Sequence, residues 1–191
     1  FCFLSFNAPH TPLQLPEKYY NLYKNADIQT NVRVSNAELK LSDQDIEDAK
    51  KIYGMITNID DNLGKLFSKL KELKIDKETV VIFMTDNGPQ QLRYNANMKG
   101  RKGTVYNGGI RVPFFINIPG NVGNKEEIDN LSAHIDILPT IAELSGAELP
   151  KKRKIDGKSL MPFIEGKDSN DRFLFSYWTR RLPEKYINMS I

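Results

Sequence analysis

The strongest pattern of hydrophobic and polar positions is a run of apolar residues at three- and four-residue spacing between residues 42 and 73. This spacing places them on one face, so it predicts a single long amphipathic helix. Ser42 can cap its first turn, and Asp45 three residues later completes a capping-box pair. Gly54 and Gly64 weaken the helix slightly but permit close packing against it. The apolar positions are Ile46, Ala49, Ile52, Tyr53, Ile56, Ile59, Leu63, Leu66, Phe67, Leu70 and Leu73.

Shorter apolar runs predict strands, because turn-forming residues bound them and they are too short for buried helices. The runs comprise residues 1–6, 79–84, 114–118 and 173–178, and we expect the first three to be buried. A second helix is predicted over residues 136–145, with Pro139 in its first turn and Gly146 as its C-terminal stop. The order strand, helix, strand, loop, strand, helix predicts an α/β fold.

The connecting segments differ in character. Two prolines in residues 7–12 force an extended loop, and the mixed, polar residues 13–41 predict loop with short helical pieces. Residues 90–112 are rich in Gly, Asn, Lys and Arg without any period, which is typical of a functional or mobile segment. Ligands of α/β sheets bind beyond the carboxyl ends of strands, so polar residues after the first two predicted strands are the first site candidates.

Composition limits the class of protein. The 191 residues suffice for one sizeable domain, and 40% hydrophobic with 27% charged residues is globular composition. The net charge of +3 is small and the basic residues are dispersed, which argues against nucleic-acid binding. The single cysteine, Cys2, excludes an intrachain disulfide, and no apolar run is long enough to span a membrane. Because the chain starts inside an apolar run without methionine, we expect it to be the later part of a longer protein.

Asp86 and Asn87 directly follow the second predicted strand, in the sequence Thr-Asp-Asn-Gly-Pro. A carboxylate beside an amide carbonyl suits a hard cation such as calcium, which takes about six to eight oxygen ligands. Two residues are too few for such a site, so the other ligands would come from substrate, water or further chain. The same sequence is typical of a simple turn, which is the favoured interpretation when it is taken alone.

Lys102 and His10 are candidates for contact with an anion. Lys102 lies among glycines, which let the backbone approach closely and the ammonium face an oxyanion. His10 lies between two prolines, where its imidazole can donate to a bound anion or to a leaving-group oxygen. Each alone is equally compatible with an ordinary surface loop. Cys2 is rejected as a nucleophile, because a buried thiol in an apolar strand without a nearby His or Arg is inert, and His134 is interpreted as structural.

Taken in order, these segments resemble the sulfatase family, of the formylglycine-dependent arylsulfatase type. The resemblance rests on six stretches in register over residues 1–166, which together are far more specific than any one of them. The stretches are residues 7–12 (Asn-Ala-Pro-His-Thr-Pro), 58–64 (Asn-Ile-Asp-Asp-Asn-Leu-Gly), 85–88 (Thr-Asp-Asn-Gly), 102–113 (Lys-Gly-Thr-Val-Tyr-Asn-Gly-Gly-Ile-Arg-Val-Pro), 134–140 (His-Ile-Asp-Ile-Leu-Pro-Thr) and 156–160 (Asp-Gly-Lys-Ser-Leu).

The resemblance implies roles for individual residues. Asp86 and Asn87 would be ligands of an active-site calcium ion. Lys102 would contact the sulfate oxygens and the leaving oxygen, and His10 would hydrogen-bond the sulfate or protonate the leaving group. Arg93 is a further candidate for contact with substrate, since the corresponding loop of similar bacterial sulfatases lies near the substrate mouth.

The fold implied by the resemblance is part of a mixed, mostly parallel sheet flanked by helices. Residues 1–166 would be the C-terminal portion of the catalytic α/β domain, and residues 167–191 the start of a small C-terminal subdomain. The implied reaction is hydrolysis of a sulfate ester by a formylglycine hydrate. No Cys/Ser-x-Pro-x-Arg motif, the source of formylglycine, occurs in this sequence. The resemblance puts that motif and the paired acidic metal ligands before residue 1, so the 191-residue chain alone is expected to be inactive.

The expected partner is a sulfated small molecule or a sulfated glycan, with no nucleic acid and no membrane insertion. The family's usual location implies a periplasmic or secreted protein. Two alternatives stay open. One is a phosphonate or phosphate ester hydrolase of the same superfamily, with an unmodified Thr or Ser nucleophile. The other is a degenerate relative that only binds sulfated glycans, against which the presence of Asp86, Asn87, Lys102 and His10 argues.

Overall fold

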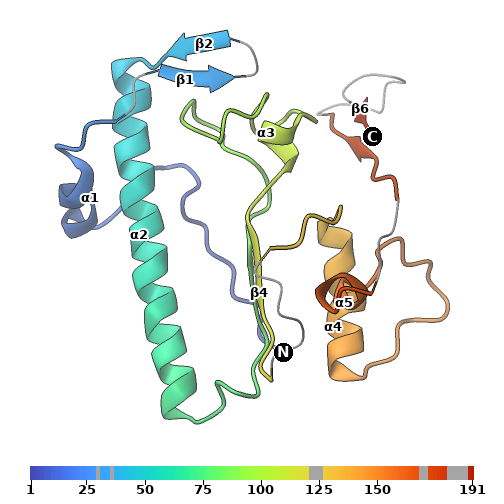
Figure 1. Cartoon of the computed structure of the whole chain (residues 1–191). Helices are drawn as coiled ribbons and strands as arrows, with labels where there is room; N and C mark the ends of the chain where they lie inside the picture. The colour runs from blue at the N-terminus through green and yellow to red at the C-terminus, as the bar shows by residue number, and fades with distance from the viewer. Residues whose placement is uncertain (29–30, 35–36, 121–126, 168–171, 180–188) are drawn as a thin grey trace. The chain divides into compact units, whose positions relative to one another are not determined.

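The computed structural model describes residues 1–28, 31–34, 37–120, 127–167, 172–179 and 189–191 (Figure 1). The chain forms two compact units. The first unit consists of residues 1–117 and 176–190, and the second of residues 118–175 and 191. Within the described ranges, no helix combines the length and the apolar character needed to cross a bilayer.

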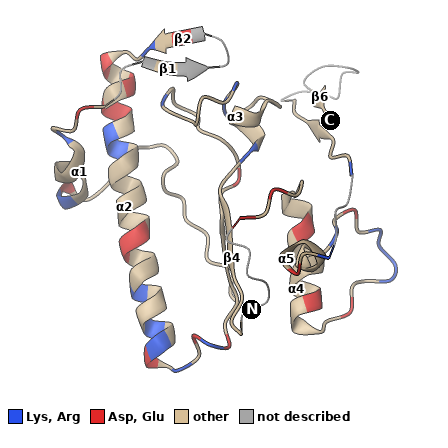
Figure 2. Ribbon diagram, in the orientation of Figure 1, with Lys and Arg blue, Asp and Glu red and all other residues tan. Residues whose placement is uncertain are grey.

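The long helix α2 (Asp43–Glu72) is the main element of the first unit, and it confirms the predicted start. The Ser42 hydroxyl accepts a hydrogen bond from the Asp45 N–H at 3.1 Å, and the Asp45 carboxylate accepts one from the Ser42 N–H at 3.0 Å. This reciprocal pair is the predicted capping box. Acidic residues lie in the first turn and Lys69 and Lys71 in the last (Figure 2), an arrangement that complements the helix dipole.

Helix α1 (Glu17–Tyr23) packs against α2 and confirms the helical piece expected before residue 41. Buried α2 residues at this contact include Ala49, Ile52 and Met55, while the C-terminal part of the apolar stripe is exposed. Three tyrosines of α1 also form hydrogen bonds to side chains of α2. The pairs are Tyr19 with Asp61 (2.9 Å), Tyr20 with Glu47 (2.9 Å) and Tyr23 with Thr57 (2.8 Å).

The two glycines of α2 make a matched pair for testing this packing. A Cβ atom on Gly54 would lie 2.5 Å from Leu15 Cδ1 and 2.9 Å from the Tyr19 carbonyl oxygen, whereas one on Gly64 would meet nothing within 4 Å. We expect Gly54→Ala to lower the free energy of unfolding by about 1–3 kcal/mol through overpacking. Gly64→Ala should raise it by about 0.5–1 kcal/mol through helix propensity. Denaturant unfolding of the two variants measures both effects, and shifts of the same sign would contradict the packing described here.

Residues 1–6 do not form the predicted buried strand. They make no β-pair in the described structure, and Cys2 is exposed together with Phe1, Phe3, Leu4 and Phe6. A strand needs neighbouring backbone to satisfy its N–H and C=O groups, and the described strands pair with one another instead. The expectation that Cys2 is buried is therefore wrong as well.

The described strands form three antiparallel pairs, so the parallel neighbours expected for the whole sheet are not among them. The predicted strands at 79–84 and 114–118 are confirmed in shorter form, although Phe115 is 65% exposed. The run at 173–178 forms strand only at its end, with Phe173 and Phe175 exposed. The pairs are β1 (Asn31–Val34) with β2 (Ala37–Lys40), β3 (Val81–Met84) with β4 (Phe114–Asn117), and β5 (Ser176–Tyr177) with β6 (Met189–Ser190).

The second unit contains the 3-10 turn η1 (His134–Asp136) and the helices α4 (Ile137–Ser145) and α5 (Met161–Ile164). The predicted second helix and its stop are confirmed, since Gly146 caps α4 in the left-handed conformation with φ 68°. Thr140 joins the two helices, because its hydroxyl donates to the Asp136 carbonyl (2.6 Å) and accepts from the Leu160 N–H (2.9 Å).

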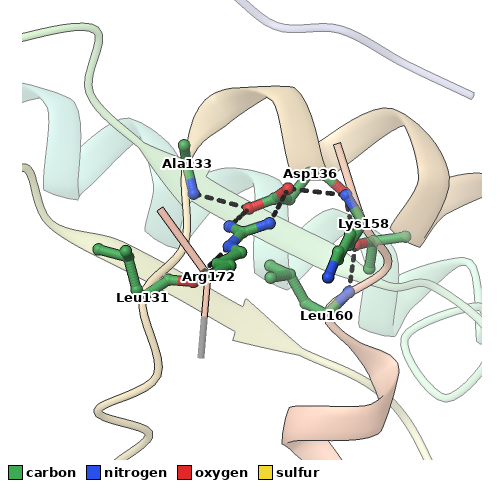
Figure 3. Close-up of polar contacts among 7 residues, drawn as sticks. Leu131, Ala133, Asp136, Lys158, Leu160 and Arg172 are labelled. Carbon is green, nitrogen blue, oxygen red and sulfur yellow. Dashed lines mark hydrogen bonds and ion pairs between the residues drawn. The ribbon is translucent and has the colours of Figure 1, made fainter. Parts of the chain in front are cut away.

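Asp136 is completely buried, and Figure 3 shows the polar contacts of its carboxylate. Its carboxylate accepts hydrogen bonds from the backbone N–H of Ala133 (2.7 Å) and Lys158 (2.9 Å). It also forms a two-armed ion pair with Arg172, of which the Nη1–Oδ1 arm measures 2.9 Å. Burial by itself raises the pKa of Asp136, but the Arg172 guanidinium and the two N–H donors outweigh it and hold the pKa below its ordinary value.

Candidate active site

The residues that follow β3 form a single long loop, residues 85–113, which we call the site loop. Met84 at the end of β3 pairs with Phe114 at the start of β4, so the site loop leaves and returns at the same end of the strand pair. Asp86, Asn87, Arg93 and Lys102 all belong to it. The sequence thus gathers four of the five candidate residues on one segment, whose two ends are anchored side by side.

Close backbone contacts hold the site loop together. The Gly88 N–H donates to the Gly109 carbonyl oxygen at 2.9 Å, and the Gly108 N–H donates to the Lys99 carbonyl oxygen at 2.7 Å. Gly108 and Gly109 lie in the short helix α3 (Asn107–Ile110). A Cβ atom on Gly88 would overlap the carbonyl oxygen of Gly108, and added Cβ atoms on Gly108 and Gly109 would overlap other carbonyl oxygens of the loop. These three positions therefore require glycine.

Asp86 and Asn87 lie at the start of the site loop, and their side chains form different hydrogen bonds. One Asp86 carboxylate oxygen accepts the Asn87 N–H at 2.9 Å, and the Asn87 side-chain nitrogen donates to the Gly88 carbonyl oxygen at 2.9 Å. Because that nitrogen is already bonded, Asn87 Oδ1 is the atom left for a cation or donor. Asp86 is exposed and Asn87 half-buried, so both can reach a ligand.

Lys102 is tied to the Asp86–Asn87 segment through its backbone. Its N–H donates to the Pro89 carbonyl oxygen at 2.8 Å, which fixes where the side chain begins. The side chain is half-buried, and its ammonium has no ion-pair partner among the described residues. A carboxylate, an amide and a cation are thus carried by one hydrogen-bonded scaffold.

Asn95 supports this scaffold and was not singled out from the sequence. Its side-chain nitrogen donates to the carbonyl oxygens of Met98 (2.9 Å) and Gly100 (3.1 Å), which folds the loop just before Lys102. The sequence likewise predicted no separate role for Gly88, Gly108 and Gly109, which belong to the stretches that resemble the family. The signal that could have found them is the density of Asn and Gly in a segment without periodicity, which indicates a backbone-packed loop.

His10 and Arg93 occupy other surroundings. The His10 Nδ1 lies 2.7 Å from the Thr11 carbonyl oxygen, which can only accept, so Nδ1 carries a proton and Nε2 faces outward from this contact. No hydrogen bond or ion pair within the described ranges joins His10 to the site loop. Arg93 lines a pocket with Tyr53 and Tyr94, and burial lowers the pKa of its guanidinium.

The side-chain oxygens of Asp86 and Asn87 suit a hard cation, but they are fewer than such a cation needs. The Asp86 carboxylate and Asn87 Oδ1 are the oxygen ligands that calcium prefers. No cluster of three or more His, Cys, Asp or Glu side chains suited to a metal occurs in the part of the chain that the structure describes. Asp86 and Asn87 are thus two adjacent oxygen-bearing side chains of the kind that a hard cation takes as ligands.

Comparison with known proteins identifies the fold and then the family. The helices and strands are those of a partial α/β domain of the alkaline-phosphatase-like fold. A family model described as Sulfatase matches residues 1–147. The chain belongs to the sulfatase family, and the resemblance inferred from the six stretches is confirmed.

Individual relatives agree with this assignment. The chain is 35% identical to human steryl-sulfatase over 139 residues, which cover 66% of the chain and 24% of that protein. It is 31% identical to an arylsulfatase of Clostridium perfringens over 191 residues, covering 90% of the chain and 39% of that protein. It also matches the solved phosphonate monoester hydrolase of Silicibacter pomeroyi, with 27% identity, a TM-score of 0.59, and 72% and 26% of the two chains covered. The chain thus spans about a quarter to two fifths of the length of these relatives.

Proposed function

We propose that the protein containing this chain hydrolyses sulfate esters, and that the chain supplies two calcium ligands and two groups that act on the sulfate. The observation that carries the proposal is the site loop. Its hydrogen bond between Lys102 N–H and the Pro89 carbonyl oxygen joins a cation to the segment of Asp86 and Asn87. The relatives named steryl-sulfatase and arylsulfatase support this class of reaction.

Asp86, through its carboxylate, and Asn87, through Oδ1, would hold the calcium ion. Bound calcium would neutralise negative charge on the ester oxygens. The remaining ligands would come from outside these 191 residues, as would the formylglycine nucleophile, since no Cys/Ser-x-Pro-x-Arg motif occurs here. The division into residues 1–166 of the catalytic domain and residues 167–191 of a C-terminal subdomain belongs to the same proposal.

Lys102 and His10 would act on the sulfate itself. Negative charge grows on the leaving oxygen as its bond to sulfur breaks, and the Lys102 ammonium would stabilise that charge. His10 would donate to the sulfate or to the leaving oxygen through Nε2 as the doubly protonated imidazolium, because in the neutral ring the single proton lies on Nδ1, toward the Thr11 carbonyl oxygen. The substrate class is a sulfated small molecule or sulfated glycan, and the proposed location is periplasmic or secreted.

Hydrolysis of a phosphonate or phosphate ester is the second candidate, supported by the similarity to the Silicibacter pomeroyi enzyme. Parallel assays of the whole protein on 4-nitrophenyl sulfate and on phenyl 4-nitrophenyl phosphonate distinguish the two. We expect the larger kcat/KM for the sulfate ester, and no turnover by the 191-residue chain alone. A preference for the phosphonate would favour the second candidate. Turnover by the isolated chain would contradict an external nucleophile, and binding of sulfated glycan without any turnover would indicate a degenerate relative.

A further inference from the structure

The turn that carries Lys102 is closed by a backbone hydrogen bond. The Thr104 N–H donates to the Arg101 carbonyl oxygen at 3.0 Å, so the four residues form a β-turn with Lys102 and Gly103 at its centre. Gly103 has a φ of 82°, which is the conformation of the second central residue in a type II turn. We call this segment, residues 101–104, the lysine turn.

An aromatic side chain from the C-terminal part of the chain lies against the lysine turn. A Cβ atom on Gly103 would lie 3.2 Å from Cζ2 of Trp178, 3.5 Å from Cη2 and 3.6 Å from Cε2. These three atoms belong to the six-membered ring of the indole, so the ring itself covers one face of Gly103. Trp178 directly follows β5, is half-buried, and belongs to the same compact unit as the lysine turn. The two segments are thus in contact although they are distant in the sequence.

This contact restricts the most adaptable residue of the turn. Glycine populates positive and negative φ about equally, so an unsupported Gly103 could leave the left-handed conformation at little cost. A rigid ring packed on this glycine opposes such a rearrangement, because closely packed groups resist even small shifts. Lys102 is the neighbouring residue of the turn, so the direction in which its side chain leaves the backbone depends on the same conformation.

We infer that Trp178 is a positioning residue for Lys102, whose indole holds the lysine turn in the conformation that directs the ammonium toward the sulfate. The inference rests on the proposed function, in which Lys102 stabilises charge on the leaving oxygen. Orientation matters at this point because a displacement of about 1 Å can lower a rate about 100-fold. The segment that follows β5 would thereby contribute to the site through its contact with the turn, without touching the reacting atoms.

Kinetics of the whole protein on 4-nitrophenyl sulfate test the inference. Trp178→Ala should lower kcat by about 10- to 100-fold and change KM by less than about threefold, because the turn is released while the other substrate contacts remain. Trp178→Phe keeps a flat ring over Gly103 and should restore kcat to within about fivefold of wild type. Phe175→Ala is the matched control, since it removes a 70% exposed aromatic ring of the same segment, and it should change kcat and KM by less than about twofold.

A double-mutant cycle with Lys102→Ala separates positioning from a general structural role. If Trp178 acts through the Lys102 ammonium, Trp178→Ala should lower kcat by less than about threefold once that ammonium is absent. A loss of the same size in both backgrounds would overturn the inference, because the ring would then act on the substrate directly or stabilise the site as a whole. An unchanged kcat in the single Trp178→Ala variant would overturn it as well. Trp178→Leu, which keeps apolar bulk without a flat ring, replaces Trp178→Ala in the cycle if that variant does not fold.

Hydrogen exchange of the lysine turn gives a readout that does not depend on the reaction. The Lys102 and Thr104 N–H groups both donate to backbone carbonyl oxygens, so the folded turn protects them from exchange. Trp178→Ala should make them exchange at least about tenfold faster, whereas Phe175→Ala should leave the exchange unchanged. If the wild-type protein hydrolyses no sulfate ester, faster exchange supports the positioning of the turn by Trp178 and assigns the failure to the proposed function. Unchanged exchange in Trp178→Ala contradicts the inference, whether or not the protein is active.

Discussion

Replacement of Lys102 by alanine is expected to lower kcat/KM for sulfate-ester hydrolysis by the whole protein about 100- to 1,000-fold. The reason is that an ammonium facing the leaving oxygen stabilises charge that is larger in the transition state than in the ground state. The half-buried position of Lys102 strengthens this effect relative to a fully hydrated charge. Initial rates on 4-nitrophenyl sulfate measure it.

Lys99 provides the matched control on the same loop. Its ammonium lies 3.8 Å from the centre of the Tyr106 ring, and its backbone carbonyl, rather than its side chain, accepts the Gly108 N–H. Lys99→Ala should therefore change the rate by no more than a few fold, the size of an exposed cation–π contact. Equal losses in the two variants would show that the loop needs positive charge in general and that Lys102 has no specific role.

Asp136→Ala is expected to lower the free energy of unfolding by about 3–5 kcal/mol. The substitution leaves the Arg172 guanidinium, whose side chain is 7% exposed, without its carboxylate, and it also removes the acceptor of two backbone N–H groups. Asp156→Ala is the control in the same unit, because Asp156 pairs with Lys154 at the surface and should matter little. Denaturant unfolding of both variants provides the comparison.

The same ion pair predicts a dependence of stability on pH. The pKa of Asp136 is lower in the folded protein than in the unfolded chain, so its stabilisation is complete above the ordinary carboxyl value of about 3.9 and is lost as the pH falls through the folded value. Asp136→Asn removes this titration. The stability difference between wild type and Asp136→Asn should therefore shrink as the solution is acidified below about pH 4. A difference that stays constant would contradict the depressed pKa.

Local sequence patterns predicted the two main helices well, because the start and the end of a helix are specified by residues within a few turns of each other. The cap at Ser42 and the stop at Gly146 depend only on neighbouring residues, and both are observed. The β1–β2 hairpin was missed, although apolar residues recur at two-residue spacing in each strand, with Val32 and Val34 in β1 and Ala37 and Leu39 in β2, the signal of half-buried strands. The alternation covers only four residues in each strand, which is the shortest length that indicates a strand.

The strand prediction at residues 1–6 failed for a different reason. A hydrophobic run specifies that a segment prefers burial, but pairing requires a partner that local sequence does not identify. The candidate site likewise combines residues that the sequence predicts with contacts that local sequence does not identify. Asp86, Asn87 and Lys102 were predicted from the order of the motifs, and their roles stay predictions. The supporting contacts of Asn95, Gly88 and Gly108 depend instead on which backbone atoms meet across the loop.

The central proposal is that Asp86 and Asn87 hold calcium in a sulfate-ester hydrolase, and a calcium titration tests it most directly. The whole protein, freed of metal by a chelator, would be titrated with calcium while hydrolysis of 4-nitrophenyl sulfate is followed, for wild type and Asp86→Asn. The account predicts that calcium restores wild-type activity and that Asp86→Asn needs at least about 10- to 100-fold more calcium for half-maximal recovery. Identical calcium requirements, or activity that is indifferent to the chelator, would contradict it.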